Sequence, residues 1–297
     1  MIAGIGKLYK GTNEVTKVYL GTKVVYNSAV PIDPDARAYL DAISPFYSAT
    51  WFDDILKTEE QFELDTSDMF IALKDNGLYA RLKAFYPFSG GTADSNKINA
   101  KDPRNLDAAF RLSFFGSPTH NYLGTTYNGT TQYDNMHLNP FVELSFTDNQ
   151  VSFYSRTAGA AGYDIGASED SGAIVNELAL IARYYLGNPD LAFYSVDDFY
   201  NLTPANSDGR GFYIGTKTGA MQKLWKNNTL LGNRNSIGSQ LPNRDLYGQA
   251  INLNGAPGFF AARNICFRSV GGGLSDAEVG IFTNIVNTAQ INQNRAI

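Results

Sequence analysis

The segment FVELSFTDNQVSFYSRT, residues 141–157, decides the fold class of this chain. Apolar and polar side chains alternate on both sides of Asp148-Asn149, and a period of two is typical of half-buried β-strands. The spacing predicts a hairpin with strands over 141–146 and 151–154. Similar segments, separated by turn residues roughly every 8–15 positions, continue to the end of GFFAARNICFRSV at residue 270. The sequence therefore predicts a mainly β protein with a jelly-roll or concanavalin-like β-sandwich.

Several further segments carry the same strand signal. Each is rich in aromatic and β-branched residues, which fit a pleated and half-buried surface. They are IVNELALIARYY (174–185), LAFYSV (191–196), GFYIGTK (211–217) and MQKLWKNNTLLG (221–232), the last with a turn at Asn227-Asn228.

Three helices interrupt this pattern. The first is capped by Asp33 or Asp35 and runs to about Ser44. The second covers about 66–86, with a stop and restart at Asp75-Asn76-Gly77 and an end before Pro87.

The third predicted helix covers about 275–291 and begins at Ser275. Glu278 follows three residues later, which makes a capping box. Val279, Phe282 and Val286 then recur on one face, so we expect this helix to lie across a sheet edge or a sandwich end.

The N-terminus holds a short repeat. KLYKGT (7–12) is nearly repeated as KVYLGT (17–22), which predicts a small β meander within residues 1–28. A unit of this size has little core and must pack against the body, another copy or a partner. We expect it to dock by strand addition through Tyr9, Val18, Tyr19 and Tyr26. A linker and helical segment (29–106) and the sandwich (107–297) complete the predicted organisation.

Composition excludes several classes of function. The net charge is −5 and charged residues make up 18%, so the chain lacks the concentrated basic surface of a nucleic-acid binder. No apolar run approaches the roughly 20 residues that span a bilayer, and the start lacks a signal peptide, which predicts synthesis in the cytoplasm without membrane insertion. Cys266 is the single cysteine and is expected to be a small buried hydrophobe.

No catalytic or metal-binding pattern emerges. His120 and His137 have no Glu or Cys at metal-ligand spacing, which argues against a metal site. Glu143 is a lone acid on its predicted strand, whereas glycoside hydrolysis needs two carboxyl groups. Val270-Gly271-Gly272-Gly273-Leu274 matches no phosphate-binding fingerprint and is interpreted as a strand-to-helix joint. We expect no catalytic residue, no metal, no cofactor and no enzymatic activity.

Two segments carry a resemblance to a known group of proteins. Phe85-Tyr86-Pro87-Phe88-Ser89-Gly90-Gly91 is followed by Asn99-Ala100-Lys101-Asp102-Pro103-Arg104. This order resembles a domain of structural and fibre-type proteins in tailed bacteriophages, including crAss-like and other phages of Bacteroides-type hosts, with a concanavalin- or laminin-G-like sandwich. The resemblance implies a virion location as a head or tail fibre or tail accessory component, with other virion proteins and further copies of this chain as partners.

Three hypotheses on function follow. The first is a non-enzymatic virion protein that acts through assembly. The alternative is a carbohydrate-binding adhesin module, with the aromatic and amide-rich loops 117–137 and 200–210 contacting a host-surface glycan. The third hypothesis, a glycan-degrading tail enzyme, requires paired acids that the sequence does not present.

Overall fold

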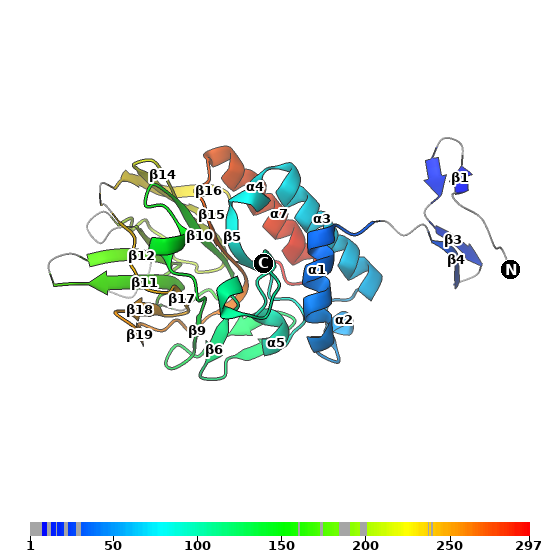
Figure 1. Ribbon diagram of the computed structural model, residues 1–297, viewed down its shortest axis with the longest axis horizontal. Coiled ribbons are helices and arrows are strands. Elements are labelled where there is room, and N and C mark those ends of the chain that lie inside the picture. Colours follow the sequence, from blue (N-terminus) through cyan, green and yellow to red (C-terminus); the bar gives the residue numbers. More distant parts are fainter. Residues whose placement is uncertain are drawn as a thin grey trace.

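The computed structural model describes residues 8–10, 13–15, 17–20, 23–27, 31–159, 161–172, 175–183, 191–196, 201–236, 238 and 240–297. Within them, two eight-stranded sheets form the body and helices cover one side (Figure 1). The predicted mainly β sandwich with a few helices is confirmed. None of the described helices is long and apolar enough to cross a bilayer.

The first sheet is built around two long antiparallel strands, β10 and β20. Strand β10 pairs with β20 along one edge and with β14 along the other. The far edge of β20 is shared by β5 and β8. In spatial order the strands are β16 (Thr229–Asn235), β15 (Met221–Lys226), β14 (Gly211–Thr218), β10 (Asp148–Ser155), β20 (Asn264–Gly271), then β5 (Leu82–Tyr86) beside β8 (Gly124–Thr126) and β7 (Thr119–Asn121).

The second sheet is assembled from shorter strands. Its order is β13 (Phe193–Ser195), β12 (Val175–Ile181), β11 (Ile165–Asp170), β17 (Tyr247–Gly248), β9 (Tyr133–Asn135) and β6 (Ser113–Phe115). β18 (Ile251–Leu253) runs parallel to β11, and β19 (Ala256–Gly258) pairs with β18. β6 is therefore an edge strand.

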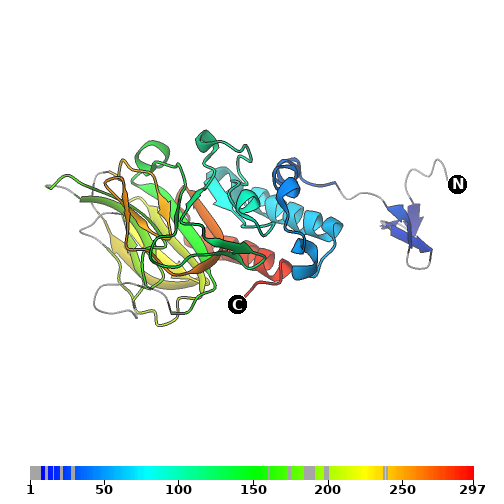
Figure 2. The same ribbon diagram turned by 90° about the horizontal axis from the view of Figure 1, so that it is seen from below.

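Helices pack on the outer face of the first sheet. Figures 1 and 2 show α1, α3 and α7 gathered on the side of the body away from β11 and β12. The helices are α1 (Pro34–Ile43), α2 (Trp51–Asp54), α3 (Glu59–Asp75), α4 (Leu78–Arg81), α5 (Ala93–Asn96), α6 (Pro140–Glu143) and α7 (Asp276–Asn292), with 3-10 turns at Ser44–Phe46 and Asp107–Ala109.

Alternation along the first sheet divides its side chains between two cores. On β14, Phe212 and Ile214 pack with the helices, whereas Tyr213 between them points into the space between the sheets. Successive strand residues point to opposite faces, so one aromatic strand supplies both cores. Cys266 is fully buried on the helical side, as predicted.

Local signals predict two helices correctly. Asp33 caps α1 by accepting hydrogen bonds from the backbone N–H groups of Asp35 and Ala36, and Ser44 follows the last residue. Ser275 and Glu278 form the predicted capping box of α7. The helix packs against α3 and places Phe282 on the rings of Phe212 and Phe267, so it covers a sheet face and not the sandwich end.

Two predicted elements are wrong in part. The predicted stop and restart at Asp75-Asn76-Gly77 is confirmed, because α3 ends at Asp75 and α4 begins at Leu78. The predicted helix does not continue to residue 86, because α4 spans one turn and Leu82–Tyr86 is strand β5, paired with β20. The predicted strand over 141–146 begins as α6, since Asn139 caps the turn and Pro140 occupies its first position. The partners of β10 are β14 and β20, which lie far away in the sequence.

The N-terminal segment forms two hairpins in place of the predicted single meander. β1 (Leu8–Lys10) pairs with β2 (Asn13–Val15), and β3 (Lys17–Leu20) pairs with β4 (Lys23–Asn27). The predicted turn at Gly21-Thr22 lies outside the described residues. Tyr9 is in β1, Val18 and Tyr19 are in β3, and Tyr26 is in β4, so their role in docking stays a prediction.

Candidate functional site

A row of aromatic rings crosses the outer face of the second sheet. We call Phe115, Tyr133, Tyr247 and Phe260 the aromatic strip. The ring centroids of Phe115 and Tyr133 are 4.6 Å apart with an interplanar angle of 9°, and those of Tyr133 and Tyr247 are 5.0 Å apart. Phe260 meets Tyr133 edge-on at 6.1 Å. The strip is thus one continuous stack from β6 to β17.

Strand register brings these rings together. Phe115 on β6 lies directly opposite Tyr133 on β9, and Tyr247 on β17 lies opposite Asn135, two residues further along. Residues two apart on a strand share a face, so all these side chains point outward. Opposite and diagonal aromatic pairs are the neighbours that stabilise a sheet surface.

Phe115 forms the exposed end of the strip. One face of its ring stacks on Tyr133, and its side chain retains 42% of its full solvent exposure. β6 is the edge strand, and within the described residues no other ring lies against Phe115. The outer face of this ring is therefore available to a ligand, while Tyr133 and Tyr247 hold the ring from behind.

The strip is anchored from beneath by a buried ion pair. Asp134 points inward between Tyr133 and Asn135 and receives hydrogen bonds from Arg268 and the Tyr127 hydroxyl, both at 2.5 Å. Asp134 and Arg268 are fully buried. Gly248 lies opposite Asp134, and a Cβ there would stand 2.2 Å from the Arg268 guanidinium. Glycine at position 248 is thus required by the close approach of the arginine.

Polar groups border the strip. The Asn135 side chain donates a hydrogen bond to one carboxylate oxygen of Asp245 at 3.2 Å, and its own oxygen accepts from the backbone N–H of His137. The second carboxylate oxygen of Asp245 accepts no hydrogen bond within the described part of the chain. Burial raises the pKa of Tyr133 and of Tyr247, so both phenols stay neutral donors at physiological pH.

The loop before β9 is held in one conformation. The Asn128 side chain accepts hydrogen bonds from the backbone N–H groups of Thr130, Thr131 and Gln132. Gln132 in turn donates to the carbonyls of Gly116 and Ser117, directly after Phe115. The predicted binding loop 117–137 therefore contributes one strip residue and the support of another.

The second predicted binding loop, 200–210, borders an open groove of about 520 Å³. Its walls come from residues 205–208 and from the β15–β16 hairpin, whose turn residues Asn227 and Asn228 have positive φ angles of 46° and 66° as a hairpin turn of this type requires. The groove residues are Ala205, Asn206, Ser207, Asp208, Lys226, Asn227, Thr229 and Leu231.

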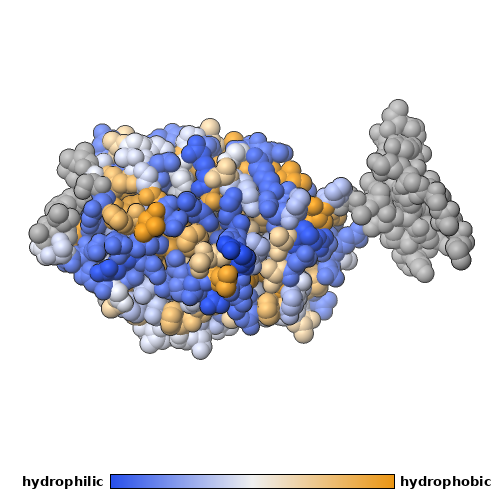
Figure 3. All heavy atoms as spheres, in the orientation of Figure 1, coloured by the Kyte–Doolittle hydropathy of each residue, from blue (hydrophilic) through white to orange (hydrophobic). Residues whose placement is uncertain are grey.

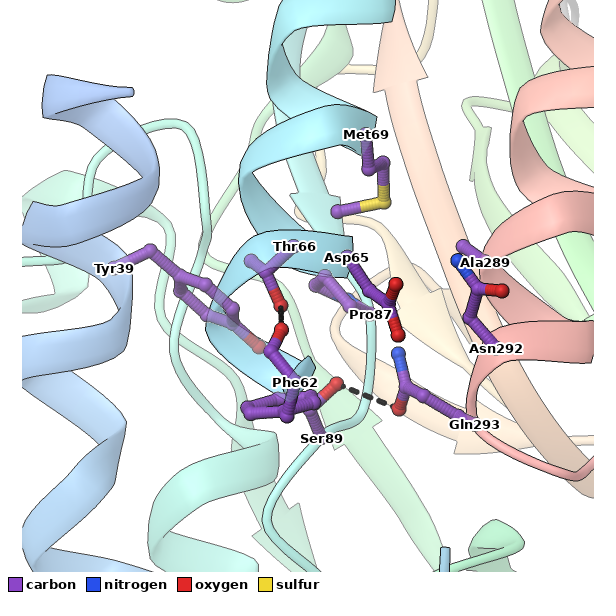
Figure 4. A pocket seen from close by; sticks show the side chains of 10 residues that line it. All are labelled: Tyr39, Phe62, Asp65, Thr66, Met69, Pro87, Ser89, Ala289, Asn292 and Gln293. Carbon is purple, nitrogen blue, oxygen red and sulfur yellow. Dashed lines mark hydrogen bonds between the residues drawn. The ribbon is translucent and has the colours of Figure 1, made fainter. Parts of the chain in front are cut away.

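A second cavity, between α1, α3 and α7, is too small for a ligand. Figure 4 shows its lining, closed at one side by the hydrogen bond from Ser89 to Gln293. Its volume is about 10 Å³, close to the minimum that holds a single water. This cavity is a packing feature of the helical layer.

The two histidines do not converge. His120 lies on β7 with its Nδ1 3.0 Å from the Thr125 hydroxyl, and burial lowers its pKa to about 4. His137 lies 2.8 Å from the Ser113 hydroxyl. No group of three or more His, Cys, Asp or Glu side chains suited to a metal occurs among the described residues.

Most of the aromatic strip could not be predicted from the sequence. Tyr133 lies inside the predicted binding loop 117–137, whereas no role was predicted for Phe115, Tyr247 or Phe260. These residues come from separate strands that pair only in the folded sheet. The short segments SFF (113–115), YDN (133–135) and LYG (246–248) share no pattern in the sequence that singles out their aromatic residues.

Comparison with known proteins gives structural neighbours alone. No family model and no curated sequence matches the chain. Domain 4 of AbnA, an extracellular GH43 arabinanase from Geobacillus stearothermophilus solved with arabinotriose, has 12% identity and a TM-score of 0.47 over 68% of this chain and 98% of its own. The type C botulinum neurotoxin in a structure on two-ganglioside cell entry has 8% identity and a TM-score of 0.48, over 71% and 52%.

The NanB sialidase from Streptococcus pneumoniae is also similar, with 12% identity and a TM-score of 0.36 over 46% of this chain and 24% of its own. All these TM-scores are below 0.5. The mainly β sandwich is defined by the order of the strands in its two sheets and by the helical layer on one of them.

Proposed function

We propose that this chain is a non-enzymatic carbohydrate-binding module whose aromatic strip stacks against a sugar ring through Phe115, its exposed end. The observation that carries the proposal is the Phe115–Tyr133 pair at a sheet edge, with one stacked face and one open face. Sugar rings present flat C–H surfaces to aromatic faces, and burying such a surface against a phenylalanine removes apolar area from water.

The polar border of the strip supports a sugar ligand over a purely apolar one. Asn135 and Asp245 lie next to Tyr247 and offer an amide and a carboxylate oxygen to hydroxyl groups. Binding sites for small ligands combine apolar walls with a few polar groups that fix orientation. Because both side chains are half-buried and hydrogen-bonded to each other, their geometry is fixed before a ligand arrives.

The distribution of apolar residues on the surface also favours a ligand that contacts a small area. In the face drawn in Figure 3, apolar residues form separate patches among polar ones. A stable protein interface buries roughly 800 Å² on each partner, whereas one or two sugar rings need a few exposed aromatic faces.

Binding without turnover is part of the proposal. Glycoside hydrolysis needs two carboxyl groups roughly 5–10 Å apart across the scissile bond. Asp245 borders the strip, but Asp134 beneath it is fully buried and paired with Arg268. Asp134 therefore lacks access to a bound sugar and does not form a pair of catalytic acids with Asp245.

The virion hypothesis stays a prediction. A fibre that carries a glycan-binding module would unite the phage resemblance with the strip, with assembly contacts through Tyr9, Val18, Tyr19 and Tyr26 and with further copies of the chain. Location in a virion and those partners require particle-level tests.

The experiment is a glycan array of bacterial and animal oligosaccharides probed with the purified chain. Phe115→Ala should weaken binding to every neutral glycan hit about tenfold, equivalent to about 1.4 kcal/mol, because the open stacking face is lost. Phe141→Ala is the matched control, since Phe141 is a similarly exposed phenylalanine on α6, with 49% exposure. Absence of any glycan hit, or equal losses in both variants, would refute the proposal.

A further inference from the structure

The polar groove between residues 205–208 and the β15–β16 hairpin has the chemistry of an anion site. Its one lysine, Lys226, lies at the end of β15 and is half-buried. The ammonium donates hydrogen bonds to the side-chain oxygen of Asn206 at 2.9 Å and to the backbone carbonyl of Asp208 at 2.5 Å. Both acceptors are neutral, so the positive charge is not cancelled by either contact.

Lys226 has donor capacity left. An ammonium group carries three N–H donors, and two are used by Asn206 and Asp208. Within the described residues the third has no hydrogen-bond acceptor. Burial lowers the pKa of Lys226, while the nearby Asp208 carboxylate opposes this change. Burial deprives the ammonium group of contacts with water, and a bound anion would stabilise its positive charge in their place.

Within the described part of the chain, the nearby Asp208 carboxylate accepts no hydrogen bond from this lysine. The Asp208 carboxylate is held by its neighbour Arg210 through hydrogen bonds of 2.8 to 3.1 Å, which lower the pKa of Asp208 to about 2. Asp208 and Arg210 therefore neutralise each other. The charge that remains at the groove is that of Lys226.

Neutral polar groups complete the groove. Asn227 is fixed because its side-chain oxygen accepts a hydrogen bond from the Phe212 N–H at 2.7 Å, and among the residues that the structure describes its amide nitrogen has no acceptor, so both N–H donors remain. A Cβ on Gly211 would stand 2.8 Å from that nitrogen, so glycine leaves room for the amide. Ser207 and Thr229 add exposed hydroxyls to the lining. Hydroxyl and amide donors beside an ammonium suit a sugar that carries an acidic group.

We propose that this groove binds the anionic group of an acidic saccharide, with Lys226 as the counter-ion and Asn227, Ser207 and Thr229 contacting neighbouring hydroxyls. The inference goes beyond the proposed function, because it assigns a second site, at the edge of the first sheet, to a different class of glycan. A carboxylate of a uronic acid and a sulfate ester share this chemistry, and the probes separate them.

The test measures binding of the full chain to trigalacturonate, to its neutral methyl ester and to a sulfated dextran oligomer by titration calorimetry. We expect trigalacturonate to bind at least tenfold more tightly than its methyl ester, with affinity falling as salt rises. Lys226→Met should remove this preference, and Lys226→Arg should retain it. Lys223→Met is the matched control, because Lys223 lies on the same strand and pairs with Asp276 outside the groove.

A second variant guards against a folding defect in Lys226→Met, since Lys226 also holds residues 206–208. Ser207→Glu places a competing carboxylate in the groove and leaves the lysine contacts intact, so it should abolish the preference for acid. Ser207→Gln is its neutral control: it loses the serine contact for both probes alike and should keep the ratio of their affinities.

Each outcome separates the two proposals. Equal affinity for trigalacturonate and its methyl ester, with the sulfated oligomer also unbound, overturns the groove site even if neutral glycans bind at Phe115. A preference for acid that survives both Lys226→Met and Ser207→Glu overturns it as well. Loss of the preference for acid in both Lys226→Met and Ser207→Glu supports the groove site. This conclusion does not depend on whether Phe115→Ala changes the binding of neutral glycans. Tighter binding of the sulfated oligomer than of trigalacturonate identifies the sulfate as the ligand group.

Discussion

The two sheets of the sandwich differ in the burial of the aromatic rings on their outer faces. On the outer face of the first sheet, Phe212 and Phe267 are almost fully buried because α7 lays Phe282 across them. On the outer face of the second sheet, no helix covers β6 and β9, the strands that carry Phe115 and Tyr133, in the described part of the chain. The same type of residue is core in one place and surface in the other.

The difference indicates that the presence of a covering helix, and not the composition of the strand, decides whether its aromatic residues belong to a core or to the surface. A helix with an apolar face turns a sheet surface into a core. Where the chain supplies no such helix, exposed rings persist at a cost in solubility, which favours a binding role over a structural one.

The largest effect is expected on the covered face. Phe282→Ala should lower the free energy of unfolding by about 3–5 kcal/mol, since it leaves a cavity beside Phe212 and Phe267. Chemical denaturation monitored by circular dichroism measures the change. A loss below about 1 kcal/mol would mean that the helix is not a true cover, and the contrast between the two faces would collapse.

An intermediate effect is expected where the sheets meet. His120 of the first sheet packs on the Phe114 ring of the second at 4.6 Å, and burial lowers its pKa to about 4. Between pH 6.5 and pH 4 the unfolded chain binds a proton at this histidine and the folded chain does not. The free energy of unfolding therefore falls as the pH is lowered through this range.

Unfolding titrations of the wild type and of His120→Gln at pH 7 and pH 4.5 test this prediction. The wild type should lose on the order of 2 kcal/mol more than the variant over that range. Identical losses would show that His120 is protonated in the folded protein and that the sheet edges are more open to water than its burial indicates.

The smallest effect on stability is expected at Phe115. Because its side chain is 42% exposed, Phe115→Ala should change the free energy of unfolding by less than about 1 kcal/mol while it weakens glycan binding. Denaturation in parallel with the array measurement checks both quantities. A stability loss as large as that of Phe282→Ala would make the strip a second core and remove the basis for its proposed role.

Sequence alone predicts those elements that are fixed by neighbours in the chain. The Asp33 cap, the Ser275 capping box and the Asn227-Asn228 hairpin all depend on residues within a few positions of each other. The fold class also follows, because alternation along β10 and β14 is a local property.

The errors and omissions arise where distant residues decide. Leu82–Tyr86 has a helical pattern, but pairing with β20, almost 200 residues later, makes it a strand. The aromatic strip unites residues 115, 133 and 247, and the charged groove unites 206 with 226. These contacts are set by sheet register, which a single sequence does not specify across long connections.

The position of β20 has a consequence for synthesis. This strand occupies the middle of the first sheet, between β10 on one side and β5 and β8 on the other, yet residues 264–271 are translated after all of them. A nascent chain on the ribosome therefore carries open hydrogen-bonding edges on β10, β5 and β8 for more than a hundred residues of elongation. Such edges favour aggregation, so we expect the yield of native protein to depend on chaperone binding during translation.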